Sequence, residues 1–296
     1  MGDSHQERLN RARIALEGLS VGDAFGSFFE FNSETVHLIN ERKLPPTPWS
    51  YTDDTNMALS VYESLRLHGE INQDTLAASY VAHFDPARNY GVGVRQMLTR
   101  MSNGESWQTV AKEMFFGEGS FGNDAAMHMA PIGAYFADDI GMVIEQARRA
   151  AEVTHTHPEG IAGAIAIAAA AACVWDSSAQ DLIAAVLPHV PAGEVRDGIQ
   201  RAHDLPANTT TQAAAEILGN GSRASVQDTV PFALWCAGKN LTNYEEAIWQ
   251  AASALGDVDT ICAIVGGIVV ARTGITGIPD EWRQHREVLP QWAAGE

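Results

Sequence analysis

Two long apolar stretches, at residues 160–174 and 261–271, constrain the fold of this chain more than any other feature of its sequence. Both are apolar on all sides and rich in Ala and Gly, which is typical of helices that are surrounded by other helices and approach them closely. Each is shorter than the roughly 18 residues that suggest a membrane span, so we expect no contact with a membrane. The sequence therefore predicts two helices buried in the core.

Most of the remaining chain also shows the spacing of helices. Apolar residues recur at intervals of three and four, with much Ala and Leu, in the segments 11–19, 57–67, 74–83, 142–152 and 161–175. Strand-like alternation is scarce, and the segments rich in Pro and Gly are too short to serve as flexible linkers. We expect a single all-α domain over residues 1–296, folded as a compact helical bundle.

The net charge and the cysteine pattern disfavour several classes of partner and of structural site. Acidic residues outnumber basic ones by 37 to 19, and the formal net charge of -18 disfavours nucleic acids and anionic membranes as partners. The three cysteines, Cys173, Cys236 and Cys262, form no CxxC pair, so neither a disulfide framework nor a structural zinc site is indicated. The polar N-terminus lacks the apolar region of a secretory signal, and we expect a cytoplasmic protein.

Two adjacent aspartates, Asp53 and Asp54, open an apolar helical segment in the sequence YTDDTNMAL. One explanation is helix capping, because Thr and Asp accept hydrogen bonds from the free N–H groups of a first turn and complement the helix dipole. Capping alone accounts for Thr52 and both aspartates if this segment is considered by itself. A second acidic helix start near the other end of the chain favours a different explanation.

The second start reads LGDVDTICAIV and contains Asp257, Asp259 and Thr260. Carboxylates in front of two buried helices would be costly without a counterion, and a bound cation would remove that cost. Four carboxylates with two threonine hydroxyls, and without His or Cys, form a set of hard oxygen ligands that suits Mg²⁺, Mn²⁺ or Ca²⁺ better than Zn²⁺. Two cations could share this set if the two helix starts meet in the fold.

Eight short motifs stand in an order that is similar to one known family. They are GDAFGSFFE (22–30), YTDDTNMAL (51–59), NYGVGV (89–94), GSFGNDAAM (119–127), VTHTHPEGIAGA (153–164), VPFAL (230–234), LGDVDT (255–260) and GIPDEW (277–282). With these the chain resembles the ADP-ribosylglycohydrolase family, which includes the dinitrogenase-reductase-activating glycohydrolase and the ADP-ribosyl-acceptor hydrolases, and it is most similar to their type 3. The resemblance implies an all-α orthogonal bundle with a two-metal cleft.

The resemblance also implies roles for individual residues. It makes two divalent cations, Mg²⁺ foremost and Mn²⁺ as an alternative, the cofactors, with Glu30 or Asp54 as the catalytic carboxylate. On the substrate side, the resemblance implies a glycine-rich turn whose N–H groups would hold a diphosphate. It also implies a histidine in the substrate cleft. The implied metal ligands are Thr52, Asp53, Asp54, Asp257, Asp259 and Thr260, and the implied substrate-binding residues are Gly119, Ser120, Phe121, Gly122, Asn123, Asp124 and His155.

The chain departs from the family pattern on the substrate side. Asp124 stands where the family usually has a glycine, and His128 stands where it usually has an arginine. The first change brings a negative charge to the phosphate-binding turn, and the second removes a permanent cation. At the second acidic helix start, Leu255 and Val258 differ from the usual family sequence, but the residues implied as metal ligands are present.

The implied reaction is hydrolysis of the bond between ribose C1 and its acceptor. The expected partners are ADP-ribosylated proteins, polymeric ADP-ribose, or a small molecule that contains ADP-ribose. Two alternatives remain open: a catalytically silent member that binds ADP-ribose, and a hydrolase of another derivative such as O-acetyl-ADP-ribose. The intact set of ligating residues favours an enzyme, whereas Asp124 and His128 favour a silent member.

Overall fold

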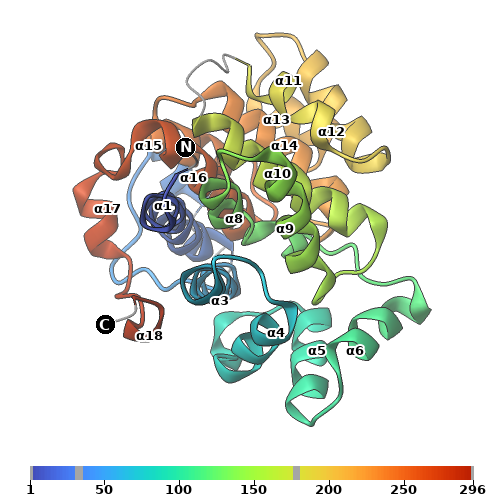
Figure 1. The fold of residues 1–296 in the computed structure, drawn as a ribbon. Helices are drawn as coiled ribbons and strands as arrows, with labels where there is room; N and C mark the ends of the chain where they lie inside the picture. Colours follow the sequence, from blue (N-terminus) through green and yellow to red (C-terminus); the bar gives the residue numbers. More distant parts are fainter. Residues whose placement is uncertain (1–2, 31–35, 176–180, 295–296) are drawn as a thin grey trace.

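The computed structural model describes residues 3–30, 36–175 and 181–294, and these residues form helices and no β-sheet (Figure 1). The predicted all-α helical bundle is confirmed. The α-helices are α1 (His5–Glu30), α2 (Val36–Glu41), α3 (Asp53–His68), α4 (Gln73–Ala82), α5 (Val92–Ser102), α6 (Trp107–Glu113), α7 (Asp124–Met127), α8 (Ala130–Tyr135), α9 (Ile140–Glu152), α10 (Pro158–Trp175), α11 (Leu182–Val186), α12 (Glu194–Asp204), α13 (Thr211–Leu218), α14 (Val226–Lys239), α15 (Tyr244–Ser253), α16 (Val258–Thr273), α17 (Asp280–His285) and α18 (Gln291–Ala294).

Short 3₁₀ helices and two isolated β-bridges complete the described backbone. One bridge pairs Trp49 with Arg286, and the other pairs Gly122 with Ser225. Each bridge joins two loops that are far apart in the sequence, and these loops border the candidate site described below. The 3₁₀ helices are η2 (Pro86–Arg88), η3 (Met114–Gly117), η4 (Leu187–His189) and η5 (Ile275–Gly277).

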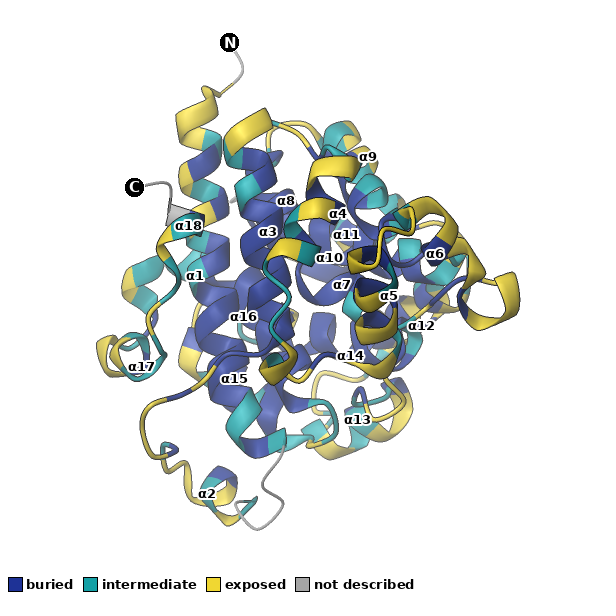
Figure 2. Ribbon diagram, turned by 90° about the horizontal axis from the view of Figure 1, so that it is seen from below, coloured by how far each residue is buried: buried dark blue, intermediate teal, exposed yellow. Residues whose placement is uncertain are grey.

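The two apolar stretches form α10 and α16, and both helices are buried as predicted. Figure 2 shows them in dark blue at the centre, with the exposed helices α2, α13 and α17 around them. By length and apolarity α10 would be long enough to cross a membrane, with 18 residues and a mean hydropathy of 1.5. Yet 72% of that helix is buried inside the fold, which is the environment of a core helix.

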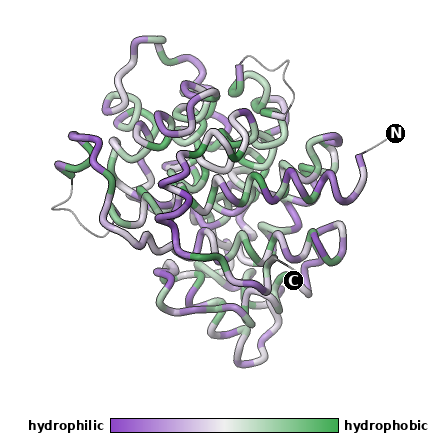
Figure 3. The backbone as a smooth tube through the Cα atoms, turned by 90° about the vertical axis from the view of Figure 1, so that its left-hand side faces the viewer, coloured by the Kyte–Doolittle hydropathy of each residue, from purple (hydrophilic) through white to green (hydrophobic). Residues whose placement is uncertain are grey.

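Helix α1 is much longer than the predicted segment 11–19, because it continues through three glycines to Glu30. In its first turns it alternates between hydrophilic and hydrophobic residues, as a half-buried helix does (Figure 3). Its second half is buried against the antiparallel helix α16 at the glycines 18, 22 and 26. Glycines lower helix propensity, but here they let two helix backbones touch, and this packing outweighs the local cost.

The closeness of α1 and α16 predicts a large effect of one methyl group. A Cβ atom built on Gly22 would lie 2.2 Å from the carbonyl oxygen of Cys262, which is backbone and cannot rotate away. We expect Gly22→Ala to lower the free energy of unfolding by about 2–3 kcal/mol, measured by urea denaturation. Gly238→Ala is the control, because its Cβ would meet nothing closer than 3.9 Å, and we expect it to add about 0.5–1 kcal/mol. Equal effects of the two substitutions would contradict this account of the packing.

The antiparallel pairing of α1 with α16 determines where the helix ends lie. Gly26 of α1 contacts the backbone of Val258 and Asp259, so the C-terminal end of α1 meets the N-terminal end of α16. Helix α3 packs on α1 and begins at Asp53, beside Asp23 of α1. The fold thus brings three helix ends, from residues far apart in the sequence, to one place.

Candidate active site

Six carboxylates lie at the meeting point of α1, α3 and α16. Oxygen atoms of Asp23, Asp54 and Asp259 lie within 4.8 Å of one another, and so do those of Glu30, Asp257 and Asp259. Asp259 belongs to both groups, so the two acidic helix starts do meet in the fold. Asp53 and Thr260 belong to neither group, but both are buried in the first turns of the same helices.

Asp23 was missed by the sequence analysis, and it organises the start of α3. Its carboxylate accepts hydrogen bonds from the N–H and the hydroxyl of Thr52, at 3.0 and 2.8 Å, and from the N–H and the hydroxyl of Thr55, at 3.0 and 2.5 Å. Two of these donors are free backbone N–H groups at the start of α3, one of the N-cap residue Thr52 and one of Thr55 in the first turn, and a local side chain would usually accept from them. Asp23 therefore caps α3 from a neighbouring helix.

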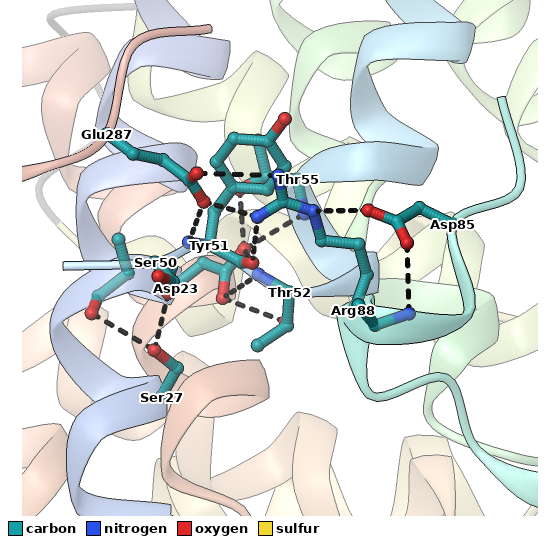
Figure 4. Close-up of polar contacts among 11 residues, drawn as sticks. Asp23, Ser27, Ser50, Tyr51, Thr52, Thr55, Asp85, Arg88 and Glu287 are labelled. Carbon is teal, nitrogen blue, oxygen red and sulfur yellow. Dashed lines mark hydrogen bonds and ion pairs between the residues drawn. The ribbon is translucent and has the colours of Figure 1, made fainter.

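A second set of contacts holds the segment before α3 from its outer side (Figure 4). Arg88 pairs with Glu287, donates to the carbonyl oxygen of Tyr51 at 2.9 Å, and stacks over the Tyr51 ring at 3.8 Å. Ser27 donates to the carbonyl oxygen of Ser50 at 2.6 Å. Because both sides of the segment are held, the position of the Thr52 hydroxyl is fixed without a cation.

Burial and mutual repulsion perturb the acidity of these carboxylates. Burial, followed by the charges of neighbouring carboxylates, raises the pKa of Asp53, Asp54 and Asp259 well above the ordinary value. Burial also raises the pKa of Asp23, to about 6, although its four hydrogen bonds act in the opposite direction. Strong perturbation of several acids at one place is characteristic of functional sites.

The residues at this place fit a divalent cation. Within the described residues, none of the six carboxylates forms an ion pair with a lysine or arginine. The buried Oδ1 atom of Asp54 has no hydrogen-bond partner in the described part of the chain, although a buried carboxylate oxygen normally needs one. The whole set consists of oxygen atoms, as Mg²⁺ and Mn²⁺ prefer. A cation would satisfy both the uncompensated charge and the unpaired oxygen.

Glu30 lies at the end of α1, beside the acidic start of α16. Its Oε2 atom accepts a hydrogen bond from the N–H of Val258 at 2.7 Å, and this bond caps α16. Partial burial raises the pKa of Glu30, the bond from Val258 opposes this, and the charge of Asp257 adds to the rise. Glu30 is thus a carboxylate next to the candidate metal centre with increased basicity, as a general base requires.

The predicted phosphate-binding turn, Gly119–Asp124, is connected to the acidic groups through Asn123. The side-chain amide of Asn123 donates to Asp257 at 2.5 Å and to the hydroxyl of Thr229 at 3.0 Å. Gly119 has a φ of 78°, which glycine adopts without strain, and Ser120 accepts a hydrogen bond from the N–H of Gly122 at 3.1 Å. The turn therefore lies against the carboxylates rather than elsewhere on the surface.

The two buried histidines near this turn differ in their contacts. His155 has its Nδ1 atom 2.8 Å from the hydroxyl of Thr154, and its Nε2 atom is 3.7 Å from Asp124. His128 contacts the hydroxyl of Tyr80 at 3.1 Å, and burial lowers its pKa to about 3, so it is neutral. His128 therefore supplies no positive charge at this position.

Phe121 is the most exposed of the predicted substrate-binding side chains. It is 42% exposed and faces His157 edge-on with ring centroids 5.1 Å apart. Phe115 and Phe116 lie on the adjoining η3 turn, and both are exposed too. This group of aromatic rings adds an apolar, open border to the polar site.

Comparison with known proteins points to one family. The family model described as ADP-ribosylglycohydrolase matches residues 4–294. The chain is 28% identical to the human protein named ADP-ribosylhydrolase ARH3 over 328 residues, which cover 94% of this chain and 90% of that protein. It is 25% identical to the protein of Pseudomonas putida named ADP-ribosylarginine hydrolase Tri1, over 97% of this chain and 78% of that protein.

A solved structure also shares the fold. The structure titled "ADP-ribosylglycohydrolase-related protein complex" superimposes with a TM-score of 0.64 at 23% sequence identity, over 98% of this chain and 96% of that one. At this identity the likeness concerns the fold alone. Because the family model covers nearly all of the chain, this protein belongs to the ADP-ribosylglycohydrolase family.

Proposed function

We propose that this protein is a metal-dependent hydrolase that cleaves the bond between ribose C1 and the acceptor in ADP-ribosylated substrates. Its family and the names of its relatives support ADP-ribosyl hydrolase activity as the general class. One observation supports the site of this activity above all others. Glu30, Asp257 and Asp259 come together beside Asp54 and the turn Gly119–Asp124.

Thr52, Asp53, Asp54, Asp257, Asp259 and Thr260 would hold two divalent cations, which supply Lewis acidity and hold the ribose hydroxyls when bound. The other contributions come from residues that the structure already orders. Glu30 takes a proton from the attacking water as the bond between ribose C1 and the acceptor breaks, and it passes this proton to the leaving acceptor atom. The surrounding carboxylates favour the positive charge that develops on the ribose in the transition state. The N–H groups of the turn at Gly119 would face the diphosphate.

The acceptor group of the substrate has space to bind beside Thr52. A hollow of about 480 Å³ opens there, between the end of α1 and the loop that precedes α5. Its walls include Ser27, Phe28, Thr52 and Asn89. A leaving group bound here would lie next to the candidate metal centre and still reach solvent.

The proposal is tested by offering the protein serine-linked, arginine-linked and polymeric ADP-ribose, with Mg²⁺ and after chelation. We expect release of ADP-ribose from at least one substrate, and only when the cation is present. Release that persists after chelation would contradict metal dependence. Inactivity on all three substrates, together with measurable binding of ADP-ribose, would favour the alternative of a binding protein.

Glu30→Gln separates general-base catalysis from binding. The amide keeps the acceptor oxygen for the N–H of Val258 but cannot take a proton. We expect kcat to fall by about 100- to 10,000-fold with little change in KM, from initial rates on the active substrate. Glu63→Gln, on the far part of α3, should leave both constants unchanged. A change in KM alone would show that Glu30 only positions the substrate.

A further inference from the structure

The carboxylate of Asp124 fills the space between two glycine turns. A Cβ atom built on Gly122 would lie 2.9 Å from Asp124 Oδ2, and one built on Gly91 would lie 3.3 Å from Asp124 Oδ1. Glycines without side chains normally leave room for a ligand to approach the backbone. Here the protein's own carboxylate occupies the room between both turns, and we call this space the anion seat.

His155 contributes an unsatisfied polar atom to the anion seat. Its side chain is completely buried, and among the residues that the structure describes its Nε2 atom has no hydrogen-bond partner. That atom would lie 3.1 Å from a Cβ atom on Gly122, and it is 3.7 Å from Asp124 Oδ2, which is too long for a hydrogen bond. An unpaired buried nitrogen is costly, and it indicates a missing partner at this place.

Asp124 is charged in this position. Burial acts to raise its pKa, but the side chain of His155 and the first N–H of α7 hold the pKa below the ordinary value. Its side chain is 19% exposed, so water screens the charge only in part. A diphosphate that approached the same turns would meet this carboxylate at close range, and like charges repel strongly at such distances in a partly buried site.

We propose that Asp124 is a specificity-determining residue whose carboxylate occupies the anion seat in the free protein. To reach His155 and the two glycine turns, the diphosphate of the substrate must displace this carboxylate. The inference rests on the proposed function, because it assumes a substrate with a diphosphate. A change of the Asp124 side-chain rotamer would move the carboxylate out of the seat. The displaced carboxylate weakens the binding of ADP-ribose and makes its release faster.

The test compares the affinity for ADP-ribose of the wild type, Asp124→Gly and Asp124→Asn by calorimetry, at one Mg²⁺ concentration and one ionic strength. We expect binding about 10- to 100-fold tighter in the glycine variant, which loses both the charge and the obstacle. The asparagine variant loses only the charge and should bind more tightly than the wild type but less tightly than the glycine variant. It also serves as the test if the glycine variant fails to fold.

Asp139→Asn is the control, because this exposed residue caps α9 far from the seat and should leave the affinity unchanged. Asp124 variants that bind ADP-ribose no more tightly than the wild type would overturn the inference. If the wild type still releases ADP-ribose from a substrate in that case, the proposed function survives and only the seat is wrong. If the wild type releases none but Asp124→Gly gains tight binding, the seat is confirmed and the proposed activity is wrong.

Discussion

Replacing Asp259 by asparagine is expected to lower kcat/KM by about 1000-fold or more while making the cation-free protein more stable. Asp259 belongs to both groups of carboxylates, so its loss damages both parts of the proposed metal centre. Asparagine keeps the oxygen that accepts a hydrogen bond from the N–H of Thr260 at 2.8 Å. The substitution therefore removes a buried negative charge with little change of shape.

The gain in stability depends on pH. The pKa of Asp259 is raised in the folded protein by burial and by neighbouring carboxylates, so folding favours its protonated form. The contribution of Asp259 to the stability of the cation-free wild type should therefore be fully present below about pH 4 and be lost as the pH rises above that value. The Asp259→Asn variant should lose less stability over the same rise in pH. With saturating Mg²⁺ the order should reverse, because only the wild type binds the cation tightly.

Thermal unfolding at pH 5 and pH 8, with Mg²⁺ and with a chelator, measures both effects. Asp280→Asn is the matched control, because its carboxylate is 82% exposed at the start of α17 and should change neither activity nor cation response. An asparagine variant at position 259 that keeps its activity would remove the metal centre from the proposed mechanism. If the Asp259→Asn variant were less stable than the wild type without cations, the argument from uncompensated charge would be wrong.

Asp23→Ala is expected to cost about 3–5 kcal/mol of unfolding free energy. The reason is that the N–H groups of Thr52 and Thr55 and the hydroxyl of Thr55 lose their acceptor in a fully buried place, while the hydroxyl of Thr52 keeps only Asp54 Oδ2 at 3.0 Å. For a chain of this size the midpoint of thermal unfolding should fall by about 6–15 °C. Activity should fall as well, because the start of α3 also carries Asp53 and Asp54.

Asp139→Ala provides the comparison, because Asp139 caps α9 through a single hydrogen bond to Met142 and is exposed. We expect it to cost about 1 kcal/mol, as an ordinary helix cap does. Urea denaturation of both variants in chelator gives the difference directly. Similar losses for the two substitutions would show that the bonds to Asp23 contribute no more than one local cap.

The helical fold could be predicted from the sequence because apolar periodicity reports burial directly. The segments that form α3, α9 and α10 were recognised in this way, and the buried character of α10 and α16 followed from their uniform apolarity. The length of α1 could not be predicted, since the close approach that makes its glycines favourable is a tertiary contact. The assignment of the whole chain to one domain stays a prediction.

The candidate site was predicted in part for a similar reason. Asp53, Asp54, Asp257 and Asp259 stand in two visible acidic motifs, and the structure brings these motifs together. Asp23 stands alone, although it is the only charged residue between Glu17 and Glu30, and that isolation in an apolar run was the available signal. The direction of the Asp124 side chain depends on packing between two turns, which no local pattern reports.

The pairing of α1 with α16 has a consequence for how the chain is made. Helix α1 (His5–Glu30) is synthesised well before its partner α16 (Val258–Thr273). Until then the glycine face of α1 has nothing to cover it, and such exposed apolar surface promotes aggregation of nascent chains. Contacts between distant segments also slow folding. Newly made α1 should therefore be at risk of aggregation until α16 has been synthesised.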